Sequence, residues 1–289
     1  AAYPENALDI LTKTAENSLT AIRVNSLKTT PTALAELLHS QGVKVVEENA
    51  YLPNSLRVAF VGSPADCPAF QEGLFHVEGE TSQIAALALG AKAGDTVIDF
   101  CAAPGGKSLA IAQEMQDKGK LYSCDVSPNR VSLIEKAVQR MGVTCAVAVQ
   151  NDAATQNPIQ GAAAANVAML ADKILADVPC SGLGILAKKP DIRYKDLVGM
   201  PELLCLQAEI LENAAACLAV GGRLVYSTCT INPAENQEQI KAFLASHPEF
   251  TLAPIAHLPS GMQVSEYGAL SLPHLTNLDG FFICALEKH

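Results

Sequence analysis

Short apolar runs alternate with longer stretches of helical periodicity along the chain from residue 96 onward. Runs of about four to eight apolar residues are typical of buried strands, whereas apolar positions three to four apart indicate one face of a helix. In chain order the predicted strands and helices are Thr96–Phe100, Ser108–Gln116, Leu121–Asp125, Pro128–Met141, Ala146–Gln150, Ile174–Val178, Pro201–Leu218, Arg223–Ser227 and Pro233–Ser246. This repeat of strand and helix predicts an α/β fold with a doubly wound, mostly parallel sheet. The late apolar run Phe281–Leu286 predicts a strand that closes the sheet at its edge.

Two of these helix starts carry a capping residue in front of proline. Ser127-Pro128 is one, and Asn232-Pro233 with Glu235 following is the other. A Ser or Asn side chain accepts hydrogen bonds from the free N–H groups of a first turn, and proline fits the first helical position. Helices are therefore expected to begin at these two prolines.

A smaller unit precedes the repeating pattern. Its predicted elements are a strand over Thr20–Asn25, a helix over Thr32–Ser40, and strands over Val43–Glu48 and Leu56–Val61. Turn residues at 62–66 end this unit, and a helix that begins near Thr81-Ser82 opens the larger domain. We predict a small α/β subdomain over residues 1–78 and a larger domain over 79–289, in which the alanine run at 162–165 forms a surface connection.

Composition narrows the class of protein. With 289 residues, 49% of them hydrophobic, the chain can bury a full α/β core and carry a smaller second domain. It has no apolar run of about eighteen residues or more, and its first residues lack the basic and then apolar layout of a signal peptide. A soluble, cytoplasmic protein is therefore expected.

The cysteines and the net charge exclude further classes. Nine cysteines are present and no two form a C-x-x-C pair, which predicts reduced thiols and argues against a disulfide framework or a zinc site. Six of them lie in apolar or featureless contexts and are expected to fill the core: Cys67, Cys124, Cys145, Cys205, Cys217 and Cys284. The formal charge of −10 argues against nonspecific adhesion to nucleic acid, so any such site must be a local basic patch.

The loop at 101–108 has the features of a nucleotide site, because it joins a predicted buried strand to a predicted helix. Its small residues let a ligand approach the backbone, and the helix start near Lys107 directs free N–H groups toward a carboxylate or phosphate. Asp125, twenty residues beyond Gly105, ends the next strand, where a carboxylate accepts hydrogen bonds from ribose hydroxyls. Asp152 ends the third strand and is a candidate acceptor for the exocyclic amine of adenine, although it is equally a candidate helix cap.

Three ligands compete for this loop. NAD is the least favoured, because the G-x-G-x-x-G fingerprint is absent. A nucleoside triphosphate is the alternative: residues 101–108 match the phosphate loop G-x-x-x-x-G-K-[ST] except at Cys101, and Ile174–Asp177 resembles a magnesium-binding strand. S-adenosylmethionine (SAM) is favoured, because a ribose-binding Asp125 has no part in phosphate-loop chemistry.

Two cysteines and an aspartate follow the next two predicted strands. The fourth strand leads into Asp177-Val178-Pro179-Cys180, and the fifth into Ser227-Thr228-Cys229. In an open α/β sheet the ligand crevice lies beyond the carboxyl ends of the strands, so these side chains are expected to converge on the cofactor pocket. A lone buried cysteine is usually inert packing, but two cysteines beside a carboxylate favour a reactive site.

With these motifs the sequence resembles the Sun/Fmu-type (Nop/Sun family) RNA 5-methylcytosine methyltransferases of the bacterial ribosomal RNA type. The matching segments, in the family's order, are Arg23-Val24-Asn25, Asp99–Ser108, Asp177–Gly182, Lys189–Tyr194, Ser227–Asn236 and Asp279–Phe282. The resemblance extends from Arg23-Val24-Asn25 to nearly the last residue of the chain. The chain departs from the family pattern at Val178, at Gln237 and at Ala187-Lys188-Lys189, which affects the expected RNA contacts more than the chemistry.

The resemblance implies that residues 79–289 transfer a methyl group from SAM to carbon 5 of a cytosine in RNA, expected to be ribosomal RNA. Carbon 5 alone is too weak a nucleophile, so Cys229 would first attack carbon 6 as a thiolate. Asp177 would hydrogen-bond ring nitrogen 3 and the exocyclic amine. Cys180 would assist loss of the carbon 5 proton and release of Cys229.

The resemblance and the loop chemistry together imply two sets of binding residues. The expected cofactor residues are Cys101, Ala102, Ala103, Pro104, Gly105, Gly106, Lys107, Asp125, Arg130, Asp152 and Asp177. The expected RNA contacts are Lys188, Lys189, Arg193 and Lys195, with Arg23 of the small subdomain as a second candidate. A solvated surface loop is the alternative for the basic cluster. RNA is the expected partner, and no membrane, metal or obligate protein partner is expected.

Overall fold

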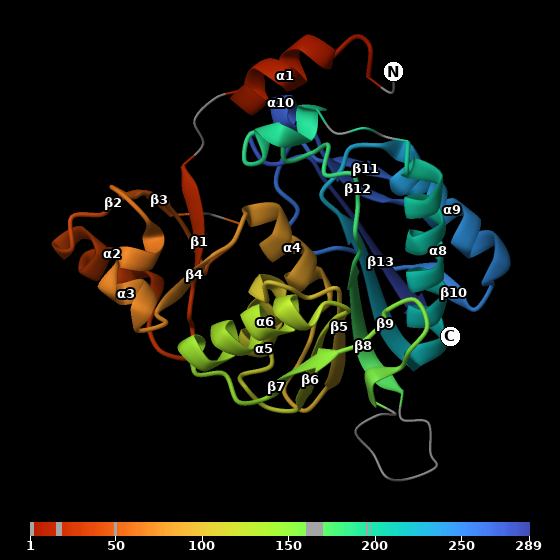
Figure 1. Ribbon diagram of the computed structural model, residues 1–289, viewed down its shortest axis with the longest axis horizontal. Helices are drawn as coiled ribbons and strands as arrows, with labels where there is room; N and C mark the ends of the chain where they lie inside the picture. The colour runs from red at the N-terminus through yellow and green to blue at the C-terminus, as the bar shows by residue number, and fades with distance from the viewer. Residues whose placement is uncertain (1–2, 16–18, 49–50, 160–169, 195, 197) are drawn as a thin grey trace.

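The computed structural model describes residues 3–15, 19–48, 51–159, 170–194, 196 and 198–289. The larger domain is built on a nine-stranded sheet with the order β11-β12-β13-β9-β8-β5-β6-β7, and β10 pairs beside β13 (Figure 1). The strands are β5 (Thr96–Phe100), β6 (Lys120–Asp125), β7 (Ala146–Gln150), β8 (Ala171–Asp177), β9 (Leu218–Thr228), β10 (Phe250–Leu252), β11 (Gln263–Ser265), β12 (Gly268–Ser271) and β13 (Phe281–Lys288).

The central pairings of this sheet are parallel. β7, β6, β5, β8 and β9 pair in parallel, and β13 adds antiparallel to β9. This arrangement confirms the predicted α/β class. The strand order reverses at β5, which lies between β6 and β8, so the crevice beyond the carboxyl ends of β5 and β8 is the expected ligand position.

Helices cover both faces of the sheet (Figure 1). One face carries α4 (Glu80–Ala88), α5 (Gly106–Glu114) and α6 (Pro128–Met141), and the other carries α8 (Met200–Cys217) and α9 (Gln237–Ser246). Neighbouring strand residues enter opposite cores because successive side chains of a strand point to opposite faces. Val97 packs in the core that includes Leu109 of α5, whereas Ile98 packs in the core that includes Ile210 of α8.

The small domain is an antiparallel sheet of order β2-β3-β1-β4 with its own core. Its elements are β1 (Thr20–Val24), α2 (Pro31–Ser40), β2 (Lys44–Glu48), β3 (Ser55–Ala59), a 3-10 turn (Pro64–Asp66), α3 (Pro68–Gln71) and β4 (Phe75–Val77). β4 ends at Val77 and α4 begins at Glu80, while the division after residue 78 stays a prediction. Helix α1 (Ala7–Ala15), which the sequence did not predict, lies beside α10 (Pro273–Thr276). Within the described ranges, no helix is long and apolar enough to cross a membrane.

The prediction of an edge strand at Phe281–Leu286 is wrong. β13 pairs with β9 on one side and with β12 on the other, and β11 forms the edge. All six residues of the run are buried, as expected for a strand that is covered on both faces. β11 and β12 have three and four residues, which is too short for a periodic signal in the sequence.

The predicted helix over Pro233–Ser246 is interrupted at Asn236. A 3-10 turn spans Pro233–Glu235, and α9 begins at Gln237. Asn236 has a φ of −115° and a ψ of −109°, outside the helical region, and its side chain bonds to Thr228 and Thr230. The helix start at Pro128 is confirmed, although the Ser127 side chain makes no capping hydrogen bond. The alanine run at 162–165 lies outside the described residues.

Polar side chains join the small domain to α6. Buried Asn25 donates from Nδ2 to the carbonyls of Gly73 (2.8 Å) and Met141 (2.9 Å). Arg140 donates to the carbonyls of Phe70 (2.7 Å) and Phe75 (3.0 Å), and its guanidinium lies 3.7 Å from the centre of the Phe70 ring. These contacts hold the small domain against the helix that follows β6.

We predict that Asn25→Ala lowers the free energy of unfolding by about 1–3 kcal/mol, because two buried carbonyls lose their hydrogen-bond donor. Urea unfolding followed by circular dichroism measures this. The control is Asn129→Ala at an exposed position of α6, where a change within about 0.5 kcal/mol is expected. Equal stability of the two variants would contradict the role of Asn25.

Candidate active site

The loop after β5 winds tightly around the start of α5. Cys101 (φ 61°) and Gly105 (φ 108°) both have left-handed backbone conformations, and glycine adopts this conformation without the Cβ penalty. The Ala102 N–H donates to the Cys124 carbonyl at 2.7 Å, which ties the loop to β6. The Ala103–Pro104 peptide is cis. The loop is therefore a tight turn of small residues that ends where α5 begins. The first N–H groups of α5 have no partner within the helix and are available to a ligand in the crevice.

A buried carboxyl group supports the loop from beneath. Asp99 on β5 is fully buried, and Ser108 Oγ donates to its Oδ2 at 2.5 Å. Burial raises the pKa of Asp99 to about 7, although the Ser108 hydrogen bond and the Lys107 charge oppose the shift. The Ser108 hydroxyl therefore donates its hydrogen bond to Asp99. In a phosphate loop the corresponding hydroxyl would coordinate magnesium.

Lys107 connects the loop to β8. Its Nζ donates to Asp177 Oδ2 at 2.8 Å, and Ser227 Oγ on β9 donates to Asp177 Oδ1 at 2.7 Å. Burial by itself lowers the pKa of Lys107, but the ion pair with Asp177, helped by Glu78 and Asp99, raises it well above the usual range. Lys107 therefore stays charged and holds Asp177 in place at the mouth of the crevice.

The two predicted cysteines are in contact. Cys180 follows β8, Cys229 follows β9, and their sulfurs lie 3.2 Å apart. The hydrogen bond from Cys180 lowers the pKa of the Cys229 thiol; burial and Asp177 oppose this shift, and Lys107 and Lys189 support it. The pKa of Cys180 is raised well above its usual value, first by the same hydrogen bond and then by burial. The two shifts favour Cys229 as the thiolate of the pair, with Cys180 as its hydrogen-bond donor.

The other predicted cofactor residues lie along the same edge of the sheet. Asp125 is 2% exposed, its Oδ1 accepts from the Ser127 N–H at 3.0 Å, and its Oδ2 lies 3.3 Å from Arg130. Arg130 also donates to the carbonyl of Ala103 at 2.9 Å. Asp152 accepts from the Ala154 N–H and the Thr155 hydroxyl, so it caps the turn after β7.

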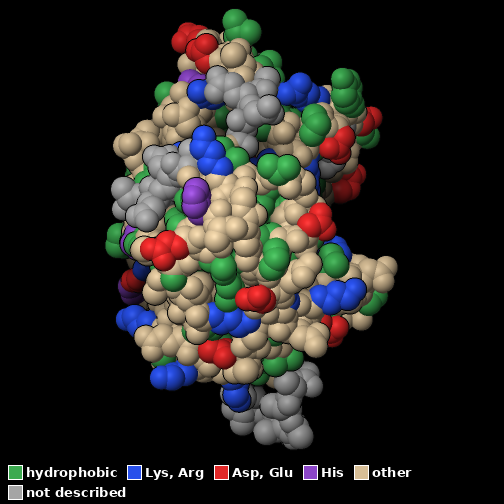
Figure 2. All heavy atoms as spheres, turned by 90° about the vertical axis from the view of Figure 1, so that its left-hand side faces the viewer, with side chains coloured by type: hydrophobic (Ala, Val, Ile, Leu, Met, Phe, Trp, Pro, Cys, Tyr) green, Lys and Arg blue, Asp and Glu red, His purple; other side chains and the backbone are tan. Residues whose placement is uncertain are grey.

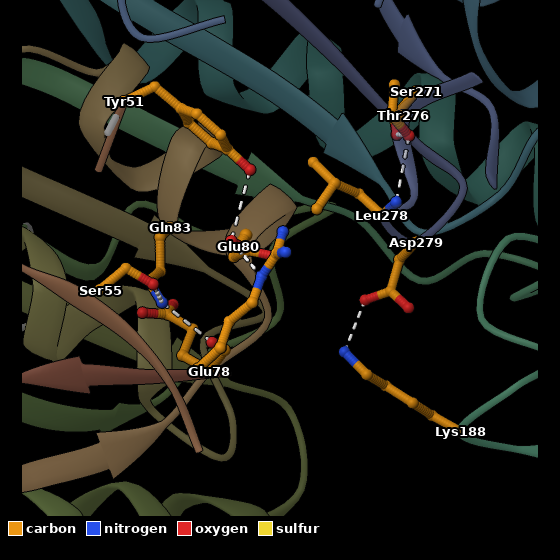
Figure 3. A network of polar contacts seen from close by, with 11 residues as sticks. Tyr51, Ser55, Glu78, Glu80, Gln83, Lys188, Ser271, Thr276, Leu278 and Asp279 are labelled. Atoms are coloured by element: carbon orange, nitrogen blue, oxygen red, sulfur yellow. Dashed lines mark hydrogen bonds and ion pairs between the residues drawn. The ribbon is translucent and has the colours of Figure 1, made fainter. Parts of the chain in front are cut away.

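The basic residues after Cys180 are exposed, but one of them is paired. Lys188 donates to Asp279 at 2.6 Å, as Figure 3 shows, while Lys189 and Arg193 are solvent-exposed. Lys195 lies outside the described residues.

A cleft of about 250 Å³ opens beside Lys188, between the small domain and the larger one, and Arg57, Glu80 and Gly184 also line it. Glu80 accepts hydrogen bonds from Arg57 and Tyr51, and Figure 3 shows Glu80 and Asp279 on opposite sides of this space. On the face that carries the small domain, Figure 2 shows acidic and basic side chains interspersed. The cleft therefore has a mixed charge.

The prediction of Arg23 as an RNA contact is wrong. Its side chain is 1% exposed, and it donates to Gln113 at 2.9 Å and to Glu114 at 2.8 Å, both on α5. It is therefore part of the contact between the small domain and α5. Its sequence motif alone did not show which partner the guanidinium takes.

Sequence reasoning missed Glu235 as a residue of this site. It was expected to help cap a helix, but it is fully buried and accepts hydrogen bonds from Ser181 and Thr230, the neighbours of the two cysteines. Its spacing from Asn232 matches a capping box, and that simpler explanation concealed the contact with Ser181.

Comparisons with known proteins agree with this geometry. Residues 86–287 match the family 16S rRNA methyltransferase RsmB/F, and residues 1–61 match the ferredoxin-like domain of RsmF/B-like methyltransferases. The chain belongs to the RsmB/F family of 16S rRNA methyltransferases. This membership confirms the predicted resemblance and argues against the phosphate-loop NTPase alternative. Among the described residues, no group of three or more His, Cys, Asp and Glu side chains is arranged to hold a metal ion.

Individual relatives extend the match over almost the whole chain. The probable ribosomal RNA small subunit methyltransferase B of Bacillus subtilis is 37% identical over 272 residues, which cover 92% of this chain and 59% of the relative. The corresponding Synechocystis protein is 36% identical, with 94% and 61% coverage. The chain thus spans about 60% of the length of these curated relatives.

Two solved structures have the same fold. The crystal structure of PH0851 is 34% identical with a TM-score of 0.91, and the match covers 99% of this chain and 63% of that one. NSun6 from Pyrococcus horikoshii with SFG is 24% identical with a TM-score of 0.86, over 98% of this chain and 94% of that one. At that identity NSun6 supports the fold alone.

We predict that Cys180→Ala moves the alkylation of Cys229 by iodoacetamide to higher pH. The Cys180 hydrogen bond stabilises the Cys229 thiolate, so its removal raises the pKa of Cys229, and the thiolate forms only at higher pH. Mass spectrometry of the Cys229 peptide over a pH series measures the midpoint. Cys205→Ala, at an exposed position on α8, is the control and is expected to leave the midpoint unchanged. A midpoint that does not rise in Cys180→Ala would contradict the assigned hydrogen bond.

Proposed function

We propose that this chain transfers a methyl group from SAM to carbon 5 of a cytosine in RNA through a covalent adduct with Cys229. The observation that carries the proposal is the contact of the Cys229 and Cys180 sulfurs at 3.2 Å, beside an aspartate that is paired to the loop at 101–107. The two thiols follow the carboxyl ends of neighbouring strands, next to a cofactor loop, and together they provide a nucleophile and a second acid–base group.

The residues beyond β5 and β6 fit SAM. Asp125 Oδ2 is buried and accepts no hydrogen bond from the described residues, so an acceptor is available for a ribose hydroxyl beside Arg130. Gly105 adopts the left-handed φ of 108° that this turn requires, and the first N–H groups of α5 favour a carboxylate. SAM is the cofactor of this methyltransferase family, and it supplies an electrophilic methyl group when bound.

The nucleophile acts first in the proposed reaction. The Cys229 thiolate adds to carbon 6 of cytosine, and the electron pair of the 5,6 double bond makes carbon 5 nucleophilic. Carbon 5 would then take the methyl group as the bond between this methyl and the SAM sulfur breaks, with the neutral thioether as the leaving group. Asp177 is placed to accept a hydrogen bond from the exocyclic amine, because each of its oxygens uses one acceptor position for Lys107 or Ser227 and has another available. These contacts orient the base over Cys229.

The adduct is resolved by elimination. A water molecule, as the proposed base, takes the carbon 5 proton, the electron pair of that C–H bond restores the 5,6 double bond, and the bond between carbon 6 and the Cys229 sulfur breaks to release the thiolate. Cys180 assists this step from contact distance: its raised pKa keeps it protonated, so it can donate a hydrogen bond to the departing Cys229 sulfur instead of attacking carbon. The two cysteines therefore have different roles although both follow strand ends.

RNA is the proposed substrate, and small-subunit ribosomal RNA the proposed class, because the relatives carry that activity in their names. The exposed Lys189 and Arg193 lie after the Cys180 loop and are proposed to contact phosphates near the target base. The small domain is proposed to contact RNA across the cleft beside Lys188. The target base must leave its stack to reach Cys229, which is easiest in a loop or a single strand.

We predict that Cys229→Ala loses methylation by about 10⁴-fold or more, since the activated nucleophile is removed. Cys180→Ala is expected to accumulate a protein–RNA adduct that survives a denaturing gel, because release of Cys229 is slowed. Transfer of labelled methyl from SAM to RNA, followed by detection of 5-methylcytosine, measures the first effect, and Cys205→Ala is the control. Full methylation by Cys229→Ala would refute the mechanism.

Removal of the exposed cations should weaken RNA binding without loss of SAM binding. For Lys189→Gln with Arg193→Gln, we predict that the slope of log affinity against log salt becomes shallower by about 0.7 for each phosphate that is no longer neutralised. RNA binding measured over a salt series tests this, and Lys136→Gln on α6 is the control with an unchanged slope. An unchanged slope in the double variant would contradict the proposed phosphate contacts and would indicate that Lys189 and Arg193 belong to a solvated surface loop.

A further inference from the structure

A buried carboxylate lies between the loops that carry the two cysteines. Glu235 ends the 3-10 turn after β9 and is fully buried. Its Oε2 accepts from the Ser181 N–H at 2.8 Å, and its Oε1 accepts from Ser181 Oγ at 2.6 Å and from Thr230 Oγ1 at 3.2 Å. Ser181 directly follows Cys180 and Thr230 directly follows Cys229, so one carboxylate holds the neighbour of each thiol.

The rest of the shell around this carboxylate also donates hydrogen bonds. Gln207 on α8 donates to Glu235 Oε2 at 3.1 Å and to the Pro179 carbonyl at 2.9 Å, and Asn232 donates to Oε1 at 3.1 Å. The Tyr226 hydroxyl donates to the backbone carbonyl of Glu235 at 2.7 Å. The Ser181 N–H, Gln207 Nε2 and Asn232 Nδ2 can only donate, and they face both oxygens of the side chain. A carboxylate accepts at both of its oxygens and therefore satisfies all three.

We propose that Glu235 is a positioning residue that locks the Cys180 and Cys229 loops together and keeps their sulfurs in contact. The role of the thiols rests on the proposed function, but the positioning is a property of the folded chain. A glutamine at this position would direct its NH₂ group at a group that can only donate in either orientation: the Ser181 N–H and Gln207 Nε2 on one side, or Asn232 Nδ2 on the other. The anchor of the Cys180 loop or that of the Cys229 loop would therefore be weakened.

Several groups besides Glu235 act on the Cys229 sulfur. Cys180 hydrogen-bonds to it, Lys107 and Lys189 favour its thiolate, and Asp177 disfavours it. The contacts of Glu235 are with Ser181 and Thr230, one residue away from the thiols, so its influence passes through the placement of the loops.

Charge and position predict opposite results for Glu235→Gln. Loss of a negative charge near Cys229 would by itself favour the thiolate and move alkylation to lower pH. Loss of the loop anchor weakens the Cys180 hydrogen bond, although the Ser181–Thr230 hydroxyl contact at 2.9 Å still joins the loops, and it moves alkylation to higher pH. The direction of the shift therefore separates positioning from a simple electrostatic role.

The test is alkylation of Cys229 by iodoacetamide over a pH series, with the Cys229 peptide quantified by mass spectrometry. In Glu235→Gln the midpoint is expected to rise toward that of Cys180→Ala, and the double variant is expected to show no further rise. The matched control is Asp117→Asn, which removes another carboxylate that accepts from several loop donors, at the start of β7 (Thr144 and Cys145), and is expected to leave the midpoint unchanged.

Turnover provides a second measurement. In Glu235→Gln, kcat is expected to fall about 100-fold, as misplacement by about 1 Å can cause, with KM for SAM unchanged. A midpoint for Glu235→Gln that stays constant or falls would overturn the proposal. Ser181→Ala removes only the Ser181 Oγ donor, and it replaces Glu235→Gln as the test variant if Glu235→Gln does not fold. The midpoint of Cys229 alkylation must then rise in Ser181→Ala, and a constant midpoint overturns the proposal.

The two proposals fail in different ways. If Cys229→Ala still methylates RNA, the proposed function is refuted, while the alkylation shift still measures the positioning. If methylation depends on Cys229 but Glu235→Gln leaves the midpoint of alkylation unchanged, the positioning alone is refuted.

Discussion

The register between β8 and β9 determines where the reactive groups meet. Asp177 is the direct partner of Ser227 in this parallel pair, so both strands end at the same level of the sheet. The next residues of each strand turn into loops, and Cys180 and Cys229 meet although 49 residues separate them along the chain. A slip of one residue would move every side chain of one strand to the other face and would separate the Asp177 carboxylate from the Ser227 hydroxyl.

The surroundings of the cysteines distinguish Cys229, the proposed nucleophile, from the buried cysteines of the core. Burial raises the pKa of Cys101 and Cys145 to about 12 and that of Cys217 to about 11, as expected for thiols in an apolar interior. Cys229 is also largely surrounded by protein, yet its pKa is lowered, because Cys180 donates to its sulfur. Its reactivity thus depends on an arrangement of two loops, which burial alone does not provide.

Much of the fold could be predicted from local pattern, because each strand of the parallel core is a compact apolar run and each helix has a marked start. The site motifs were also visible, since Cys180 and Cys229 both follow strand ends and parallel strands share one carboxyl edge. The position of β13 could not be predicted, because an apolar run shows that a strand is buried but does not show which strands lie beside it. Arg23 and Glu235 were misassigned for a related reason: a charged residue in a motif has no local signal for a partner 91 or 54 residues away.

The charge distribution suggests how an acidic chain can select RNA. Arg57 and Lys188, which line the cleft, are already paired with Glu80 and Asp279, so a phosphate there must compete with a carboxylate that is in place. Such competition lowers the gain from any single phosphate contact and weakens binding to arbitrary RNA. The exposed Lys189 lies close enough to Cys229 to favour its thiolate, so one exposed cation lies near the place where the proposed target base would enter. Recognition of the proposed RNA substrate would then depend on the shape and base contacts at the crevice more than on total charge, which agrees with a net charge of −10.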